Sequence, residues 1–280
     1  MRDGFYTLDF HYPIKGCRAV KIAASDVTTG GLVGDRQWVL VNQDGIVNQK
    51  KLPTLRFLDI ALEQDGMTLS FKGAGRVRAD FADSESSGEV VSIGRQVACE
   101  HAAEPINRWL SQAFGQPLSL VRAVEARPLQ LAGTPFSALH NMSQSAFVDI
   151  APLLIVSLES LADLNGRLSY EGKRTVAIEQ FRPNVVIEGV DAFAEESAKR
   201  IEIGAMELTQ LLPCERCSVT TFDISIESES EAKPSKEPLK TLSQYRNGGV
   251  GYAGGVTFGA YFAPESDGRL QVGDEINVIE

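Results

Sequence analysis

The stretch QWVLVNQDG, residues 37–45, decides the fold class, because an apolar run that stops at Asn, Asp and Gly is typical of a β-strand followed by a turn. Two similar runs, RVRADF at 76–81 and EVVSI at 89–93, follow with Gly- and Ser-rich turns between them. Short strands at this spacing predict a barrel or sandwich, not a parallel sheet with crossover helices.

One helix is predicted over residues 104–114. Pro105 suits its first turn, where the missing N–H costs nothing, and Gly115 is a natural end. Five apolar residues recur at the spacing of a single helical face: Ile106, Trp109, Leu110, Ala113 and Phe114.

A change of domain is expected soon after this helix. A strand-like run occupies 118–121, and the segment 127–134, which contains Pro and Gly, suits a linker. We therefore predict two domains, residues 1–122 and residues 123–280.

The second half is also expected to be rich in strands. PLLIV at 152–156 is typical of a buried strand, and Ser157 is suited to cap a helix over 158–165. The polar stretch 227–238 predicts a solvated loop. Further strands are predicted at 184–187, 200–203, 207–211, 218–222 and 275–279. The expected fold class is mostly β with α+β elements and peripheral helices.

Composition narrows the function classes. The 280 residues carry a formal net charge of −10, which argues against nucleic-acid binding. No apolar run approaches the ~18 residues of a membrane span. The first residues lack the pattern of a secretory signal, so we expect a cytoplasmic protein.

Four cysteines are too few for a disulfide scaffold, but two of them form Cys214-Glu215-Arg216-Cys217. The pair is open to four interpretations: half of a zinc site, a redox dithiol, two buried thiols, or one thiolate that binds a soft metal held by another molecule. Arg216 would lower the pKa of a neighbouring thiol by favouring the anion. Spacing alone does not choose among the four.

Three short segments place basic residues beside glycine or proline. They are YPIKGCR at 12–18 with Lys15, GGLVGDR at 30–36 with Arg36, and FRPN at 181–184 with Arg182 and Asn184. Glycine-loop amides together with Lys and Arg suit a phosphate group, although none of these segments has the P-loop spacing.

These segments, with others in the same order, resemble the MOSC proteins, named for the molybdenum cofactor sulfurase C-terminal domain. The resemblance runs from about residue 3 to residue 280. It is strongest to the branch with an N-terminal MOSC β-barrel domain, which includes mitochondrial amidoxime-reducing components and YcbX-type bacterial reductases. The matching segments are 12–17, 34–38, 160–165, 181–184, 213–221, 237–242, 245–246, 258–259 and 272–274.

The resemblance implies an N-terminal β-barrel-like domain followed by a MOSC β-barrel domain, with a molybdenum-pterin cofactor between them. It implies that Cys214 is the molybdenum ligand and that Cys217 matches a second cysteine, which is not generally the ligand. The other cofactor-binding positions that it implies are Lys15, Arg36, Ser157, Arg182 and Asn184, with Arg216 beside the ligand.

The implied activity is the reduction of N-hydroxylated substrates, such as hydroxylamines, amidoximes and N-hydroxylated bases. The alternative is a non-redox sulfur carrier or cofactor-handling protein with a persulfide on Cys214. The cysteine set of an iron–sulfur cluster is not expected in this chain, so electrons would come from a separate ferredoxin- or flavoprotein-like donor. Two departures from the family pattern are Gly16 and Glu215, which replace the usual serines.

Overall fold

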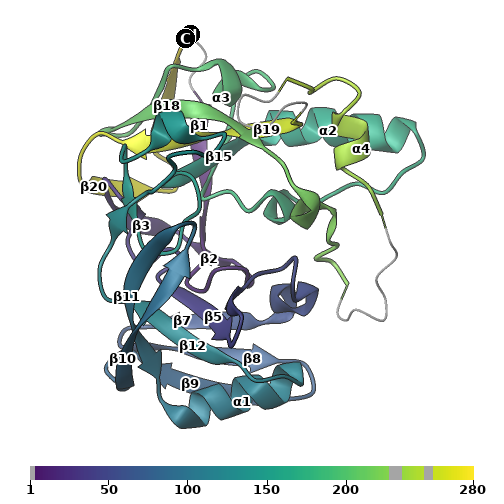
Figure 1. Ribbon diagram of the computed structural model, residues 1–280. Helices are drawn as coiled ribbons and strands as arrows, with labels where there is room; N and C mark the ends of the chain where they lie inside the picture. Colours follow the sequence, from purple (N-terminus) through teal and green to yellow (C-terminus); the bar gives the residue numbers. More distant parts are fainter. Residues whose placement is uncertain (1–3, 227–234, 249–254) are drawn as a thin grey trace.

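Strands dominate the chain in the computed structural model, which describes residues 4–226, 235–248 and 255–280. Seven of them form a closed barrel in the upper part of Figure 1, because β1 pairs with both β21 and β16. In spatial order the barrel strands are β16 (Val185–Glu188), β15 (Leu153–Ser157), β19 (Thr257–Pro264), β18 (Met206–Glu215), β17 (Arg200–Ile203), β21 (Glu275–Ile279) and β1 (Gly4–His11). The mostly β fold class is confirmed.

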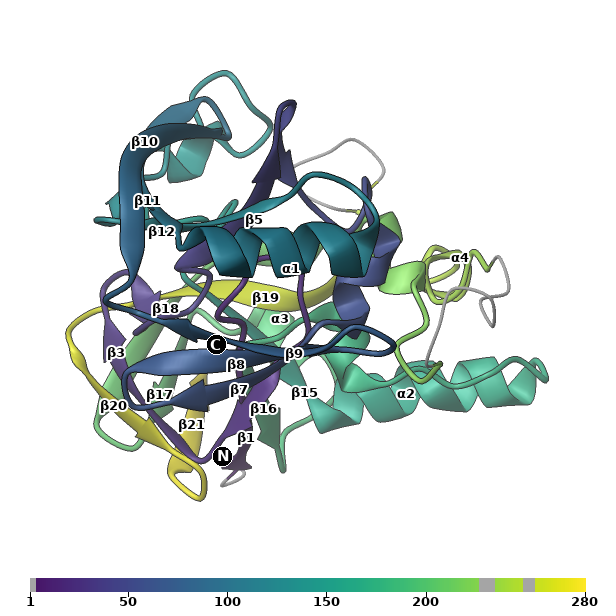
Figure 2. The same cartoon turned by 90° about the horizontal axis from the view of Figure 1, so that it is seen from below.

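The lower part of Figure 1 holds two antiparallel sheets. The first contains, in spatial order, β10 (Ser84–Ser92), β11 (Arg95–Ala102), β12 (Ser119–Ala123), β5 (Trp38–Asn42) and β6 (Gly45–Val47). The second contains β7 (Asp59–Glu63), β8 (Gly66–Phe71) and β9 (Gly75–Asp80). Buried side chains from both sheets share one core with the helix α1 (Glu104–Phe114), which packs against β12 and β9 (Figure 2).

Helices are few and lie outside the barrel. α1 has the predicted bounds and ends at Gly115 in the left-handed conformation, at φ 66°. The others are α2 (Leu158–Tyr170), α3 (Ala194–Ser197) and α4 (Leu239–Leu242), with short 3₁₀ turns at Pro53–Phe57, Ser137–Leu139, Ile178–Phe181 and Ser218–Thr221. Ser157 caps α2, as its sequence position predicts.

One local prediction is wrong. Residues 218–222 are not a strand: Ser218–Thr221 is a 3₁₀ turn, in which Thr220 Oγ1 donates to the Cys217 carbonyl at 2.9 Å. In the segment 127–134, which suits a linker, Leu129 and Leu131 are buried in a small core of their own. In the predicted loop 227–238, residues 227–234 lie outside the described residues.

The first strands of the chain pair with strands from its second half. β2 (Val20–Ile22) extends the barrel sheet from β1. β3 (Ala24–Thr28) pairs with β4 (Gly31–Leu32) and with β20 (Gly268–Gln271). A further pair, β13 (Arg127–Pro128) and β14 (Gln144–Ser145), follows the N-terminal sheets. A division at 122/123 therefore remains a prediction, with about the first 32 residues paired across it.

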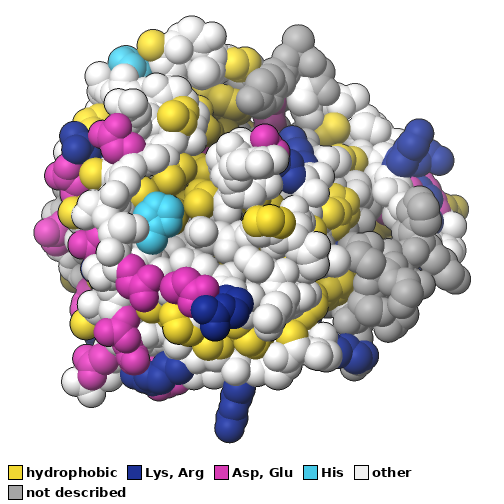
Figure 3. All heavy atoms as spheres, turned by 60° about the horizontal axis from the view of Figure 1, so that its bottom comes forward, with side chains coloured by type: hydrophobic (Ala, Val, Ile, Leu, Met, Phe, Trp, Pro, Cys, Tyr) yellow, Lys and Arg dark blue, Asp and Glu magenta, His cyan; other side chains and the backbone are white. Residues whose placement is uncertain are grey.

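Two surface properties bear on function. Within the described residues, none of the helices is both long and apolar enough to cross a membrane. On the face shown in Figure 3, Asp and Glu side chains gather toward the left, whereas Lys and Arg side chains are scattered. This distribution agrees with the net charge of −10.

Candidate functional site

A cavity of about 230 Å³ collects most of the predicted site residues from both halves of the chain. Cys217, Gly16 and Glu215 line it as well. The predicted residues that line it are Lys15, Arg36, Arg182, Asn184, Cys214 and Arg216. Ser157 is the one predicted residue that does not.

Asp35 organises the basic side of this cavity, although the sequence interpretation did not single it out. Its side chain is only 3% exposed and pairs with Arg36. Oδ1 accepts the backbone N–H of Tyr12 at 2.8 Å, and Oδ2 accepts Asn184 Nδ2 at 3.1 Å. Arg36 Nη1 in turn donates to Asn184 Oδ1 at 3.1 Å. Arg36 and Asn184 are therefore held in place before any ligand arrives.

Arg36 and Arg182 form a strained, highly cationic pair. Both have positive φ, 46° and 56°, which is uncommon for residues other than glycine. Their guanidinium carbons lie 4.5 and 4.2 Å from the Tyr12 ring centroid. Burial lowers the pKa of Arg182, and the neighbouring Arg36 adds to that effect. For Arg36, burial also opposes the charge, but Asp35 outweighs it and the pKa is raised.

Arg182 donates to the Cys17 carbonyl at 2.8 Å and has no carboxylate partner in the described part of the chain. Lys15, across the cavity, pairs with Asp149, a half-exposed residue that the sequence interpretation also missed. An anion in the cavity would gain from Arg182 without breaking an existing ion pair. The donor set therefore fits a phosphate-bearing ligand.

Gly16 explains one departure from the family pattern. Its φ is +84°, in the region that favours glycine, and an added Cβ would lie 3.3 Å from the side chain of Leu55. The chain therefore makes a tight turn beside Lys15 at this position. A serine there would instead place a hydroxyl beside Lys15.

The two cysteines of the cavity differ in accessibility. Cys214 lies on β18, is 1% exposed and packs in the apolar core beneath the cavity. Its Sγ–H donates weakly to the Glu215 carbonyl at 3.7 Å. Burial raises the pKa of Cys214, and the opposing effect of Arg216 is smaller. The predicted effect of Arg216, which favours the thiolate, is therefore present, but burial outweighs it and the pKa of Cys214 is raised. Cys217, three residues later, is exposed.

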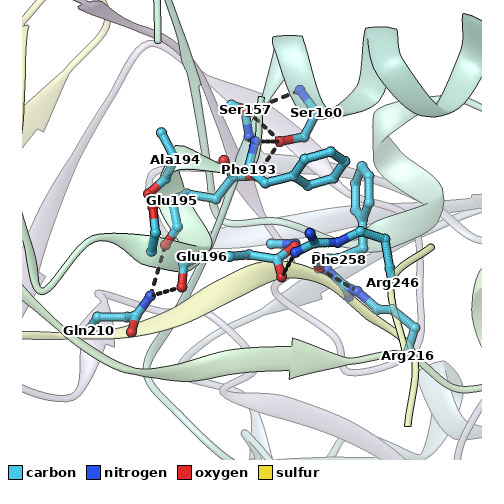
Figure 4. A network of polar contacts seen from close by, with 12 residues as sticks. Ser157, Ser160, Phe193, Ala194, Glu195, Glu196, Gln210, Arg216, Arg246 and Phe258 are labelled. Carbon is cyan, nitrogen blue, oxygen red and sulfur yellow. Dashed lines mark hydrogen bonds and ion pairs between the residues drawn. The ribbon is translucent and has the colours of Figure 1, made fainter. Parts of the chain in front are cut away.

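Two of the three guanidinium nitrogens of Arg216 have hydrogen-bond partners in the described residues, and the third does not. Nε donates to the Phe258 carbonyl at 2.8 Å (Figure 4). Nη1 donates to the Phe181 carbonyl, also at 2.8 Å. Nη2 is buried and has no hydrogen-bond partner among the residues that the structure describes. Buried donors are rarely left unpaired, so this atom also fits a ligand with acceptor oxygens.

Ser157 belongs to a different network. Its Oγ accepts the Ser160 N–H at 3.1 Å and caps α2. The carboxylate of Glu195, which is fully buried, accepts the Ser157 N–H at 3.1 Å and the Ser160 hydroxyl at 2.8 Å (Figure 4). The structure thus gives Ser157 a role in holding α2 against α3, away from the cavity.

The zinc interpretation gains no support. In the described ranges 4–226, 235–248 and 255–280, no three His, Cys, Asp or Glu side chains gather as a metal-binding group. What the cavity offers instead is a thiol pair beside a cluster of cations.

Comparison with known proteins identifies the family. The sequence matches the MOSC domain over residues 143–277 and the MOSC N-terminal beta barrel domain over residues 9–117. It is 31% identical to the mitochondrial amidoxime-reducing component 1 of Homo sapiens, over 96% of this chain and 81% of that protein. It is 30% identical to the mitochondrial amidoxime reducing component 2 of Bos taurus, over 95% and 80%. The molybdenum cofactor sulfurase of Oryza sativa subsp. japonica is 31% identical, over 84% of this chain but 30% of that protein.

Proposed function

Because the chain belongs to the MOSC family and carries a MOSC domain behind a MOSC N-terminal β-barrel domain, we propose that it is a molybdenum-cofactor-dependent reductase of N-hydroxylated compounds. The substrates would be hydroxylamines, amidoximes and N-hydroxylated bases. The observation that carries the proposal is one cavity that brings a thiol pair together with Lys15, Arg36 and Arg182. Relatives named for amidoxime reduction match nearly the whole chain.

The residues of the cavity divide into two groups by chemistry. Lys15, Arg36 and Arg182 would hold the anionic end of the cofactor, with Asn184 fixing Arg36. A cysteine thiolate would bind the metal, because soft metals prefer thiolate ligands. When bound, the cofactor supplies the chemistry that takes up two electrons and two protons, removes oxygen from an N–OH group, and releases amine and water.

The choice of metal ligand falls between the two cysteines. The family pattern assigns Cys214, whereas accessibility favours Cys217, because Cys214 is 1% exposed and Cys217 is exposed at the same cavity. Burial also opposes the thiolate form of Cys214. A ligand at Cys217 would leave Cys214 as a packing residue beneath the site.

The rest of the protein would contribute rigidity. Asp35 and Asn184 hold Arg36 in one orientation, and two carbonyls hold Arg216, so these cations need no rearrangement to meet the cofactor. Electrons would come from a separate ferredoxin- or flavoprotein-like protein. A cytoplasmic location is part of the same proposal.

The test pairs Cys214→Ser with Cys217→Ser in a host that makes the cofactor. Molybdenum per protein and the rate of reduction of an aromatic amidoxime are measured for both variants and the wild type. The ligand variant should lose its metal and activity, and the other should keep most of both. Two variants that retain wild-type metal and rate would overturn the proposal.

A second candidate is a sulfur carrier or cofactor-handling protein, supported by the match to the rice molybdenum cofactor sulfurase. In that case a cysteine of the pair, Cys214 according to the family pattern, would carry a persulfide. Intact-protein mass spectrometry separates the two functions: an added sulfur on the cysteine, without molybdenum, supports the carrier and contradicts the reductase.

A further inference from the structure

Two segments of the family resemblance, 245–246 and 258–259, have no part in the proposed function. They contain Arg246, Phe258 and Gly259, which form one group with Glu196 of α3 and with Arg216 (Figure 4). Of these five residues, only Arg216 lines the cavity. Glu196 and Arg246 instead line a separate open groove. The group therefore connects this groove to the wall of the cavity.

One peptide group joins Glu196 to Arg216. The N–H of Gly259 donates to Glu196 Oε1 at 3.0 Å, and the carbonyl of Phe258 accepts Arg216 Nε at 2.8 Å. The carbonyl and the N–H belong to the same peptide unit, so the carboxylate and the guanidinium hold its opposite ends. An anion at the N–H and a cation at the carbonyl polarise the peptide group in the same sense, which strengthens both hydrogen bonds.

The backbone can adopt this arrangement because residue 259 is glycine. Its φ is +73°, and an added Cβ would lie 2.6 Å from the Ile155 carbonyl oxygen, which is too close for any other residue. The pairing of β18 with β19 also shifts register here, between Pro213 and Glu215. Glu196 supplies the Gly259 N–H with an acceptor at the point where the strand pairing is irregular.

Glu196 is itself held in place. Its side chain is only 5% exposed and pairs with Arg246 through Oε2, which leaves Oε1 for Gly259. The guanidinium carbon of Arg246 lies 4.1 Å from the centroid of the Phe193 ring, and the Arg246 carbonyl accepts the Thr257 N–H at 3.1 Å. Arg246 also balances the charge of a buried carboxylate, which would be costly to leave unpaired.

Arg216 is the cation whose position depends on this group. Its Nη1 donates to a second carbonyl, that of Phe181, at 2.8 Å. Both of these partners are neutral carbonyls, so they orient the guanidinium without cancelling its charge. The charge is therefore available to an anion in the cavity that Arg216 lines.

We propose that Glu196 is a positioning residue for the cavity. It fixes the Phe258–Gly259 peptide group, the peptide group fixes Arg216, and Arg216 adds a charge of fixed position to the other cations of the cavity. Arg246 holds Glu196 from the side of the groove. This role rests on the proposed function in one respect, that the cavity takes an anionic ligand, and it requires no metal.

The test uses the full chain without cofactor and inorganic pyrophosphate as the anion, measured by calorimetry in magnesium-free buffer. Arg216→Gln should weaken pyrophosphate binding about five- to tenfold, because one nearby cation is lost.

Two charge-matched pairs of proteins then isolate the hydrogen bond to Gly259. Glu196→Gln and Glu196→Leu are both neutral, but only the glutamine keeps an acceptor. The wild type and Glu196→Asp are both charged, but the aspartate is one methylene too short to reach Arg246 and Gly259 together. In each pair the second protein should bind pyrophosphate about three- to tenfold more weakly.

The dependence on Arg216 separates positioning from a general structural role. Within each pair the difference should vanish when both proteins also carry Arg216→Gln, because residues that act through one another are not additive. A structural role would give the same difference in both backgrounds. Glu159→Ala is the matched control, since the Glu159 carboxylate accepts the Gly189 N–H at 2.8 Å, and its loss should leave the affinity unchanged.

Thermal melts identify the variants that fold, and the aspartate pair decides alone if Glu196→Leu does not. The proposal is overturned by an absence of saturable pyrophosphate binding, by wild-type affinity in Arg216→Gln, or by equal affinities within either pair of folded proteins. It is also overturned by a difference that persists with Arg216→Gln, or by an equal loss in Glu159→Ala. The reductase proposal fails instead on the molybdenum content and rate of the cysteine variants, so the two failures are distinguishable.

Discussion

At the scale of single residues, the buried carboxylate of Asp35 is the group on which the cationic pocket depends. It pairs with Arg36 and accepts hydrogen bonds from Asn184 and Tyr12. Asp35→Asn would leave Arg36 buried beside Arg182 without its counter-charge. Breaking a buried pair from one side typically costs about 3–5 kcal/mol. We expect a loss of that size in the free energy of unfolding, measured by denaturant titration.

Asp59→Asn is the matched control for this prediction, since Asp59 also pairs with an arginine but is 56% exposed. Its loss should be about 0–1 kcal/mol. Equal losses for the two variants would mean that burial does not set the strength of the Asp35 pair. The sequence interpretation singled out Arg36 and passed over Asp35, although they are adjacent, because the motif shows the charge without showing which partner is buried with it.

At the scale of elements, α2 depends on Ser157. Ser157→Ala removes the hydroxyl that accepts the Ser160 N–H. The expected cost is about 0.5–2 kcal/mol of stability. Under the proposed function, folded Ser157→Ala protein should bind as much molybdenum as the wild type, because the residue does not line the cavity. Loss of metal at unchanged stability would instead show that Ser157 contributes to cofactor binding.

Glu195, where α3 meets α2, should make stability depend on pH. Burial raises the pKa of this carboxyl, and the Ser160 hydrogen bond opposes the shift without cancelling it. A carboxyl with a raised folded pKa stabilises the fold fully below its ordinary value of 4.5, and this contribution is lost as pH rises through the folded value. Glu195→Gln should therefore gain stability relative to wild type as pH rises above 4.5, by up to about 1.4 kcal/mol per pH unit within that window. Thermal melts from pH 4.5 to 8 measure this gain, and parallel curves would contradict it.

Local patterns predicted elements better than they predicted turns. The helical face from Ile106 to Phe114 and the stop at Gly115 are properties of the segment itself, so the sequence revealed them. Val219 to Phe222 has strand-forming side chains, but hydroxyls at Thr220 and Thr221 close a tight turn on Cys217 and Ser218 instead. That competition depends on where the chain must go after Cys217, which composition does not encode.

At the scale of the whole molecule, the barrel needs its first strand. β1 pairs with β16 on one side and β21 on the other, so residues 123–280 alone would leave two open edges. We expect this fragment to show no cooperative thermal unfolding and to aggregate, and we expect co-expression with residues 1–122 to restore a soluble complex. A fragment that melts cooperatively near the full-length temperature would show that β1 is dispensable.

Pairings of this range were beyond local pattern analysis. Phe5 lies opposite Glu188 and Glu275, more than 180 residues away, and nothing within the segment around it specifies those partners. The convergence of Lys15, Arg36 and Cys214 was expected only through the family resemblance, for the same reason. Which residues from the two halves of the chain line one cavity depends on the topology of the fold, not on the local sequence.

The position of β1 also has a consequence for biosynthesis. Its barrel partners are β16 and β21, and the latter extends to Ile279. Ribosomes add about 5–20 residues per second, so the opening strand waits for many seconds with unsatisfied edges while the remaining chain is translated. The nascent protein is exposed to chaperones and proteases throughout that interval. The proposed cofactor would need both halves of the cavity, so it could be inserted only after the last barrel strand has left the ribosome.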